Sequence, residues 1–235
     1  MSESRIREEN LDRLKKVAEG AGIDLIASAR IDEGFRNTIH DAIRGEASEL
    51  VSILVMGMRL SVPVLSTVKT APTWTYYHHY RMVNIALDQV ALRIAGECIR
   101  MGHSAFPVPA SQILDWDRLL AHLSHREAGF LAGLGWRGRN NLLVNPRFGS
   151  QVRYTTVLTD LPLPESHALE SDCGQCVDCI KVCPVGAIHE DPEQFDLDKC
   201  AAQLRRFSKE EKLNALICGL CVRACSGRRL ERSQS

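Results

Sequence analysis

The sequence lacks three features that would assign it to a broad class of protein. No apolar run approaches the roughly 18 residues that a membrane-spanning helix needs. The opening segment, MSESRIREENLDRLKK, is too charged to supply the apolar core of a secretion signal. The 29 basic and 29 acidic residues cancel, so the bulk charge predicts no strong attraction to nucleic acid. We therefore expect a cytoplasmic protein that does not associate with membranes.

Cysteine, by contrast, is abundant, with nine residues in a chain of 235. Disulfides are a poor explanation, because the cytosol keeps thiols reduced and a chain of this length can bury a core without them. Metal binding is the better interpretation. Eight of the nine lie between Cys173 and Cys225, which predicts a body over residues 1–165 and a metal module over residues 166–235. Cys98 stands apart on the apolar face of an expected helix, where a cysteine is usually a small hydrophobe rather than a ligand.

Hydrophobic periodicity predicts an α+β body, in which an α/β arrangement carries a mixed sheet. Segment 61–80 contains two prolines and is expected to be irregular. Strands at 141–144 and 152–160 flank a turn and favour a hairpin. The other expected strands are 23–29, 52–58 and 103–110, and the expected helices are the opening segment up to residue 17, 82–101 and 117–134.

The spacing of the eight cysteines predicts two 4Fe-4S clusters. The run CGQCVDCIKVCP is the bacterial ferredoxin pattern, in which three closely spaced thiolates bind one cubane and the fourth cysteine ligates another. Zinc is the alternative metal, but zinc modules usually use two separated pairs of cysteines. We therefore expect a bacterial two-cluster ferredoxin-like module after the body. The crossed rule assigns Cys173, Cys176, Cys179 and Cys225 to cluster 1, and Cys183, Cys200, Cys218 and Cys221 to cluster 2.

The stretch that leads into this run, REAGFLAGLGWRGRNNLLVNPRFGSQVRYTTVLTDLPLP, resembles the corresponding stretch of epoxyqueuosine reductases. These are cobalamin-dependent reductases that carry two such clusters and distantly resemble reductive dehalogenases. The strongest motifs are AGLGWRGRNNLL, VLTDLPLP and the cysteine set, in that fixed order, and YYHHYRMVNIALD is a weaker one. The resemblance implies a cobalamin between the body and the cluster module, with electrons passing through the clusters to cobalt.

The resemblance also places candidate cobalamin contacts in the glycine-rich segment before the cysteines. Glycines allow close backbone approach, Trp136 offers a flat apolar wall, and two asparagines offer amide donors. The alternative is a tight helix-to-strand connection in which the glycines only turn the chain and Arg137 and Arg139 are solvated. The candidate contacts are Gly135, Trp136, Gly138, Arg139, Asn140, Asn141, Gly149 and Ser150.

Two departures from the family pattern bear on function. The family carries a helical-repeat domain after the clusters that helps hold tRNA, whereas this chain ends ten residues after Cys225, which argues against a tRNA partner. The family also carries a catalytic aspartate in a DTxP-like motif, and the matching region ILDWDRLLAHLSHREAG has no clean equivalent. Asp115, Asp117 and His125 are the nearest candidate proton donors. Their structural alternatives are a helix N-cap for an aspartate and a surface or core-edge position for the histidine.

Three functions are consistent with these features. The leading hypothesis is a cobalamin-binding reductase that passes electrons from two 4Fe-4S clusters to a corrinoid. Its electron donor would be of the ferredoxin or flavodoxin type, and its substrate a small molecule or a corrinoid protein. The alternative is an electron carrier that reduces a partner protein without binding cobalamin or catalysing a reaction itself. A redox or oxygen sensor is a third hypothesis, which no residue selects.

Overall fold

The structure is a computed structural model that describes residues 2–227. The chain divides into two compact units that interleave along the sequence. The first unit contains the segments up to residue 58, 83–134 and 153–169, and the second contains 59–82, 135–152 and the segment from residue 170 onward. The division of the chain into two domains at residue 165 remains a prediction.

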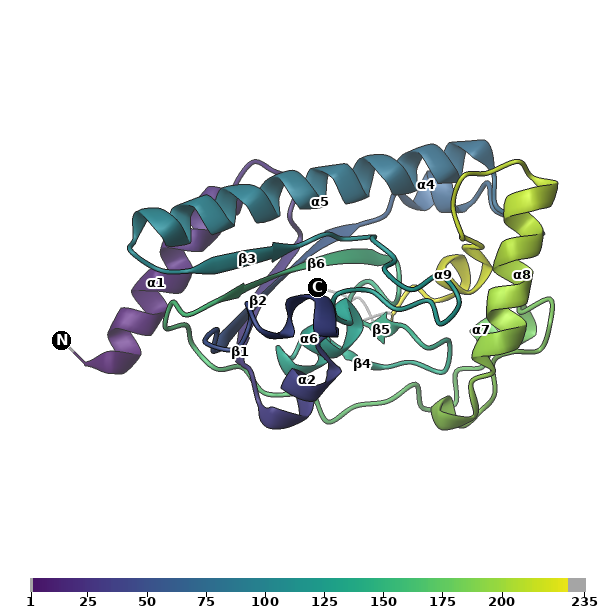
Figure 1. The fold of residues 1–235 in the computed structure, drawn as a ribbon. Coiled ribbons are helices and arrows are strands. Elements are labelled where there is room, and N and C mark those ends of the chain that lie inside the picture. Colours follow the sequence, from purple (N-terminus) through teal and green to yellow (C-terminus); the bar gives the residue numbers. More distant parts are fainter. Residues whose placement is uncertain (1, 228–235) are drawn as a thin grey trace, which may run out of the picture. The chain divides into compact units, whose positions relative to one another are not determined.

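A four-stranded sheet forms the centre of the first unit (Figure 1). β1 (Leu25–Arg30) pairs antiparallel with β2 (Ser52–Arg59), and β3 (Ala105–Val108) pairs antiparallel with β6 (Val152–Thr159). The backbone of Val51 donates to the carbonyl of Thr159, whereas that of Leu60 donates to the carbonyl of Gln151, so β2 and β6 also run antiparallel. The α+β class is confirmed, and the sheet is antiparallel where a mixed sheet was expected. Its order is β1–β2–β6–β3.

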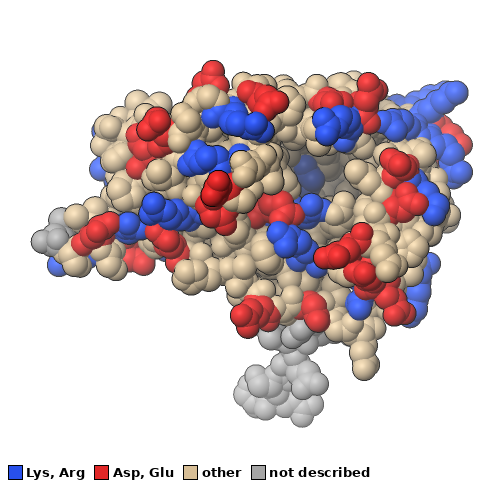
Figure 2. Space-filling view, turned by 60° about the horizontal axis from the view of Figure 1, so that its bottom comes forward, with Lys and Arg blue, Asp and Glu red and all other residues tan. Residues whose placement is uncertain are grey.

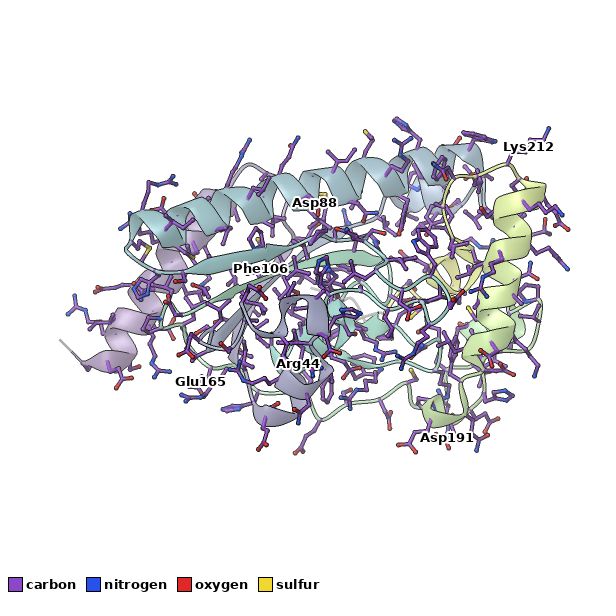
Figure 3. All side chains as sticks on the ribbon, in the orientation of Figure 1. Arg44, Asp88, Phe106, Glu165, Asp191 and Lys212 are labelled. Carbon is purple, nitrogen blue, oxygen red and sulfur yellow. The ribbon has the colours of Figure 1, made fainter. Side chains whose placement is uncertain are left out.

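Two helices supply apolar side chains to the core of this sheet, α1 (Glu3–Ala18) and α5 (Trp74–Arg100). Leu14 of α1 and Ile94 of α5 are fully buried there beside Leu54 of β2. Cys98 also lies in this core with no exposed surface, as the structural interpretation predicts. Asp88, labelled in Figure 3, accepts a hydrogen bond of 2.8 Å from the backbone of Ala110 and so ties α5 to the loop after β3. Within the described chain, no helix has the length and apolar character required to cross a bilayer.

Several expectations about the elements were wrong at their ends. α5 begins at Trp74 rather than near residue 82, because the Thr73 hydroxyl accepts from the backbone of Tyr76 and caps the helix. The helix expected over 117–134 is only α6 (His125–Leu131), which Ser124 caps by accepting from the backbone of Glu127. The expected hairpin is not formed either, since β5 (Leu143–Val144) pairs with β4 (Trp136–Arg137) and β6 belongs to the larger sheet.

The second unit contains the β4–β5 pair, the cysteine segments and short helices. α7 packs against α9, and α4 packs against α9 as well. Charges of both signs are interspersed over the face drawn in Figure 2. The helices of this unit are α4 (Val62–Leu65), the first turns of α5, α7 (Asp178–Lys181), a 3-10 turn (Pro192–Gln194), α8 (Leu197–Glu210) and α9 (Leu220–Ala224); α2 (Glu33–Thr38) and α3 (Asp41–Arg44) belong to the first unit.

Candidate metal centre

The structure gathers the eight cysteines of the second unit into two groups. Burial, and after it the neighbouring thiols of Cys225, Cys173 and Cys176, together raise the pKa of the Cys179 thiol to about 11. These four are the first cysteine group. They are the set that the crossed rule assigns to cluster 1.

The remaining four are the second cysteine group. Burial also raises the pKa of Cys200 to about 11, with contributions from Cys218 and Cys183. The pKa of Cys221 is raised by burial first and then by these same three thiols and by Cys179. Cys221 therefore lies beside a member of the first group. Cys179 is on α7 and Cys221 on α9, and these helices pack together, so the two groups adjoin.

A cavity of about 170 Å³ lies against the first cysteine group and is lined by all four of its members. Thiols spread around a cavity suit a cubane, which presents one iron to each of four thiolates. Among the described residues, no three His, Cys, Asp or Glu side chains converge closely enough to hold a single metal ion. Because burial opposes the thiolate form, the positive charge of iron is what would draw off these protons. The donor set fits a 4Fe-4S cluster.

Arg139 holds the loop of the first cysteine group in place. Its guanidinium donates to the carbonyl oxygens of Glu190 at 2.6 Å, Cys176 at 2.8 Å and Gly174 at 2.8 Å. The planar fork of arginine suits several acceptors at once, which a lysine cannot match. The alternative interpretation, in which Arg139 is merely solvated, does not describe a guanidinium bonded to three carbonyl oxygens. Arg137, two residues earlier on β4, is exposed.

Trp136 reaches the same group from β4. Its indole Nε1 donates to the Cys173 sulfur at 3.4 Å, and its side chain is buried. Two further candidate cobalamin contacts bond to each other, since the Asn140 amide donates to the Ser150 hydroxyl at 2.9 Å in a buried position. Both Trp136 and Asn140 line the cavity of the first group.

Gly149 brings two backbone segments into direct contact. A Cβ at this position would overlap the carbonyl oxygen of Cys225 and the backbone of Gly227, and φ is +60°. The adjacent Ser150 backbone donates to the Cys225 carbonyl at 3.2 Å. A side chain at Gly135 or Gly138 would likewise overlap Val144. Contacts with other protein atoms therefore explain why these positions are glycine. Asn141 has a left-handed backbone with φ at 59°, and its N–H donates to the carbonyl of Gly138 in a turn.

The candidate proton donors have structural partners in the first unit. The Asp115 carboxylate accepts from the backbones of Asp117 at 3.0 Å and Arg118 at 2.9 Å, so it caps a turn, while Asp117 itself is exposed. The cap expected for an aspartate is present, but it closes a turn rather than a helix. Both aspartates belong to the first unit, whereas all eight cysteines of the two groups belong to the second.

His125 is held at both ring nitrogens. Nε2 lies 2.9 Å from the carbonyl oxygen of Pro109, so it must donate, and Nδ1 lies 2.8 Å from the Thr156 hydroxyl, from which it accepts. Burial lowers the pKa of His125 to about 4. A neutral histidine with a hydrogen bond at each ring nitrogen is a structural residue. This favours the core-edge interpretation of His125 over that of a proton donor.

Two functional candidates have no counterpart in the sequence-based list. Gln151 donates from its side chain to the carbonyl of Arg223 on α9 at 3.0 Å, and Gln203 is buried on α8, the helix that also carries Cys200 of the second cysteine group. The only available signal for Gln203 was a polar residue on the apolar face of a helix, three residues after Cys200.

Comparisons with known proteins agree with the cysteine geometry. The family model described as the 4Fe-4S double cluster binding domain matches residues 172–228, which include both cysteine groups. Epoxyqueuosine reductase from Bacillus anthracis is 37% identical over 111 residues, covering 44% of this chain and 29% of that protein. This chain is similar in sequence to the epoxyqueuosine reductases. The enzyme from Pseudomonas aeruginosa is 28% identical over 179 residues, covering 70% of this chain and 46% of that protein. The chain thus spans less than half the length of these curated relatives.

Solved structures show that the fold of this chain is shared more widely. The catabolic reductive dehalogenase NpRdhA, in complex with 3-bromo-4-hydroxybenzoic acid, matches with a TM-score of 0.71 at 20% identity, covering 92% of this chain and 31% of that chain. A selenomethionine-labelled epoxyqueuosine reductase matches with a TM-score of 0.60 at 20% identity, covering 95% and 66%. The expected resemblance to both families is confirmed at the level of fold.

Proposed function

We propose that this chain is an iron–sulfur reductase that carries electrons through two 4Fe-4S clusters to a bound cobalamin. The proposed ligands are the first cysteine group, Cys173, Cys176, Cys179 and Cys225, for cluster 1, and the second cysteine group, Cys183, Cys200, Cys218 and Cys221, for cluster 2. The observation that carries this proposal is the separation of the eight thiols into two complete sets of four.

The contact between the two groups supports electron transfer from cluster to cluster. Cys179 and Cys221 belong to different groups, yet the charge on one influences the pKa of the other. The helices that carry them pack directly together. Two clusters held by these cysteines would be close neighbours within one unit, as in the two-cluster ferredoxins whose cysteine run this chain shares. A single chain can therefore receive an electron at one cluster and release it from the other.

Support for the cobalamin comes from relatives rather than from the predicted contacts. One structural neighbour, with a TM-score of 0.63 at 21% identity, is a reductive dehalogenase whose structure suggests a mechanism for B12-dependent dehalogenation. When bound, a cobalamin supplies the cobalt centre that performs the reduction. However, Trp136, Arg139, Asn140 and Gly149 already have partners around the first cysteine group. These residues form no evident cradle for a macrocycle, so no catalytic step is assigned to them.

That same observation favours a second candidate function. If segment 135–151 serves to support cluster 1, the chain could be an electron carrier that reduces a corrinoid protein or another partner without binding cobalamin. Its donor would again be of the ferredoxin or flavodoxin type. The first unit then needs another explanation, because a two-cluster ferredoxin requires little beyond its cysteine loops. For this reason we place the carrier second.

The substrate of the proposed reductase is a small molecule or a larger partner. One epoxyqueuosine reductase of similar fold was solved with an epoxyqueuosine-modified tRNA stem loop, at a TM-score of 0.56 and 18% identity. This similarity weakens the sequence-based argument against tRNA. A tRNA stem loop therefore belongs among the substrates to be tested once a cobalamin is bound.

Anaerobic titration with hydroxocobalamin separates the two functions. The cluster-reconstituted protein is titrated, desalted and analysed for iron, sulfide and cobalt together with its visible spectrum. Near-stoichiometric cobalt supports the reductase, whereas iron for two cubanes without cobalt supports the carrier. Exposed histidines can also ligate cobalt, and His78 is one of them. The His78→Gln variant is the matched control, and it should retain all cobalt that is bound at a dedicated site.

A further inference from the structure

Gln203 is a buried amide whose side-chain nitrogen has no hydrogen-bond partner in the described part of the chain. Its side chain is 5% exposed, and it lies on the buried face of α8 between Ala201 and Phe207. Buried amide N–H groups in folded proteins are almost always bonded, because leaving one unpaired forfeits the hydrogen bonds that water would supply. The acceptor for Gln203 is therefore to be sought in a group that binds to this unit.

The position of Gln203 on α8 identifies that group. Cys200 lies three residues earlier, and residues three apart are neighbours on one face of a helix. Long helical side chains lean toward the N-terminus, which directs the Gln203 amide over the turn that carries Cys200. When cluster 2 is bound, the Cys200 thiolate and the inorganic sulfur atoms of the cluster would supply acceptors near that turn. We propose that the Gln203 amide donates an N–H···S hydrogen bond to cluster 2 and raises its reduction potential.

The direction of this effect follows from charge. Reduction adds one electron to the cluster, and an N–H dipole that points at sulfur stabilises the more negative state. Hydrogen bonds to the sulfurs are among the factors that set cluster potentials. The inference rests on the ligand set proposed for cluster 2, since it needs Cys200 as a ligand. It goes beyond the proposed function by naming a residue that tunes the reduction potential of cluster 2.

Cluster 1 has its own donor, which provides an internal reference. The Trp136 indole donates to the sulfur of Cys173 at 3.4 Å. Trp136→Phe removes this N–H while keeping an aromatic ring, so it should lower the potential of cluster 1 alone. Gln203→Leu removes the amide while approximately keeping the volume, so it should lower the potential of cluster 2 alone. Each variant thus identifies the redox wave of one cluster.

The experiment is a redox titration of the reconstituted wild type, Gln203→Leu and Trp136→Phe, followed by visible and EPR spectroscopy, with iron and sulfide measured on each. The loss of one net hydrogen bond changes the ratio of reduced to oxidised cluster about fivefold to tenfold at a fixed potential, where tenfold corresponds to 59 mV for one electron. Gln203→Leu should lower one wave and Trp136→Phe the other. The inference is overturned if Gln203→Leu retains two cubanes and moves neither wave, or moves the wave that Trp136→Phe identifies.

A measurement on the wild-type sequence covers the case in which Gln203→Leu fails to fold or loses iron. Protein labelled with ¹⁵N only in glutamine side-chain amides is reduced and examined by pulsed EPR for a ¹⁵N coupling to a cluster. A coupling that persists in Gln175→Leu, which alters an exposed glutamine beside cluster 1, supports the inference, and its absence from the wild type overturns it. Failure of the underlying ligand set would appear separately, as a Cys200→Ala variant that keeps iron for two cubanes.

Discussion

The two cysteine groups are held in different ways. The first lines a cavity together with Trp136, Arg139 and Asn140, and its Cys176 is exposed. Its loops depend on hydrogen bonds and close backbone contacts from segment 135–151, far from the cysteines in sequence. In the second group, Cys200 lies on α8 and Cys221 on α9, and burial raises the pKa values of Cys200, Cys218 and Cys221. Two helices thus carry half of the second group, whereas a separate segment supports the loops of the first.

This difference explains why the motif AGLGWRGRNNLL accompanies the cysteine run. The run itself fixes only the local spacing of four thiols. Cys225, the fourth member of the first group, is brought to its place by Gly149 and Ser150, which contact its backbone carbonyl. Changes in segment 135–151 should therefore damage cluster 1 and spare cluster 2, and the following predictions test that asymmetry.

The largest expected effect is the loss of one whole cluster. Cys179→Ala should remove about four iron atoms from cluster 1, and Cys221→Ala about four from cluster 2, because each cubane needs its full set of thiolates. Iron and sulfide analysis after anaerobic reconstitution measures both variants. Full iron retention in either one would break the ligand assignment. Cys98→Ala is the control, since this buried core thiol belongs to neither group.

A methyl group at Gly149 should come next in severity. Its Cβ would overlap the Cys225 carbonyl at a φ of +60°, so Gly149→Ala combines overpacking with a left-handed backbone and should cost roughly 3–5 kcal/mol. Cluster 1 should release its iron to a chelator much faster than in the wild type. Gly186 has the same φ of +60° but nothing within 4 Å of its Cβ, so Gly186→Ala is a matched control that should cost only about 1–2 kcal/mol. Equal iron release in the two variants would contradict the role of the close contact.

Replacement of Arg139 should weaken cluster 1 through geometry rather than charge. Arg139→Lys keeps the positive charge but cannot bond to three carbonyl oxygens at once. We therefore expect the free energy of unfolding, measured in urea, to fall by roughly 2–4 kcal/mol. The chelator should again remove iron from cluster 1 first. Arg206 forms an exposed pair with Glu210, and such pairs contribute little, so Arg206→Lys should match the wild type. If Arg139→Lys also matches the wild type, the three hydrogen bonds of Arg139 do not stabilise cluster 1.

The smallest effect on the clusters is expected from His125, which lies in the first unit. Its pKa is about 4 in the folded chain against about 6.5 when unfolded. The folded state thus disfavours the protonated form, and the associated stability, roughly 3 kcal/mol, is present above pH 6.5 and lost as the pH falls toward 4. His125→Gln should flatten this part of the pH profile in urea unfolding between pH 7 and pH 4.5. Its iron content at pH 7 should be unchanged, and an iron loss there would show that the two units are coupled.

Periodicity and spacing were sufficient for much of this structure. The apolar stripe from Val83 to Met101 predicts most of α5, and runs such as SILVMGM predict buried strands. The cysteine spacing predicts the two groups because the ferredoxin pattern assigns the last cysteine of each set, Cys183 and Cys225, to the other cluster. The starts of α5 and α6 were missed, although the capping hydroxyl residues Thr73 and Ser124 stand directly before them.

The support around cluster 1 could not be predicted in the same way. The acceptors of Arg139 are backbone carbonyls, which every residue has, so no side-chain pattern reveals them. The contact at Gly149 depends on the approach of Cys225, 76 residues later in the chain, which spacing does not encode. Glycines and asparagines consistent with a macrocycle site are equally consistent with tight backbone packing, and only the three-dimensional structure separates the two.

The central claim is that the eight cysteines bind two 4Fe-4S clusters, and iron and sulfide analysis with Mössbauer spectroscopy tests it most directly. Anaerobically reconstituted protein should contain about eight iron and eight sulfide per chain, all of the iron in cubanes. Protein purified with about two zinc ions and no sulfide, or protein that takes up only about four iron atoms, would contradict the account.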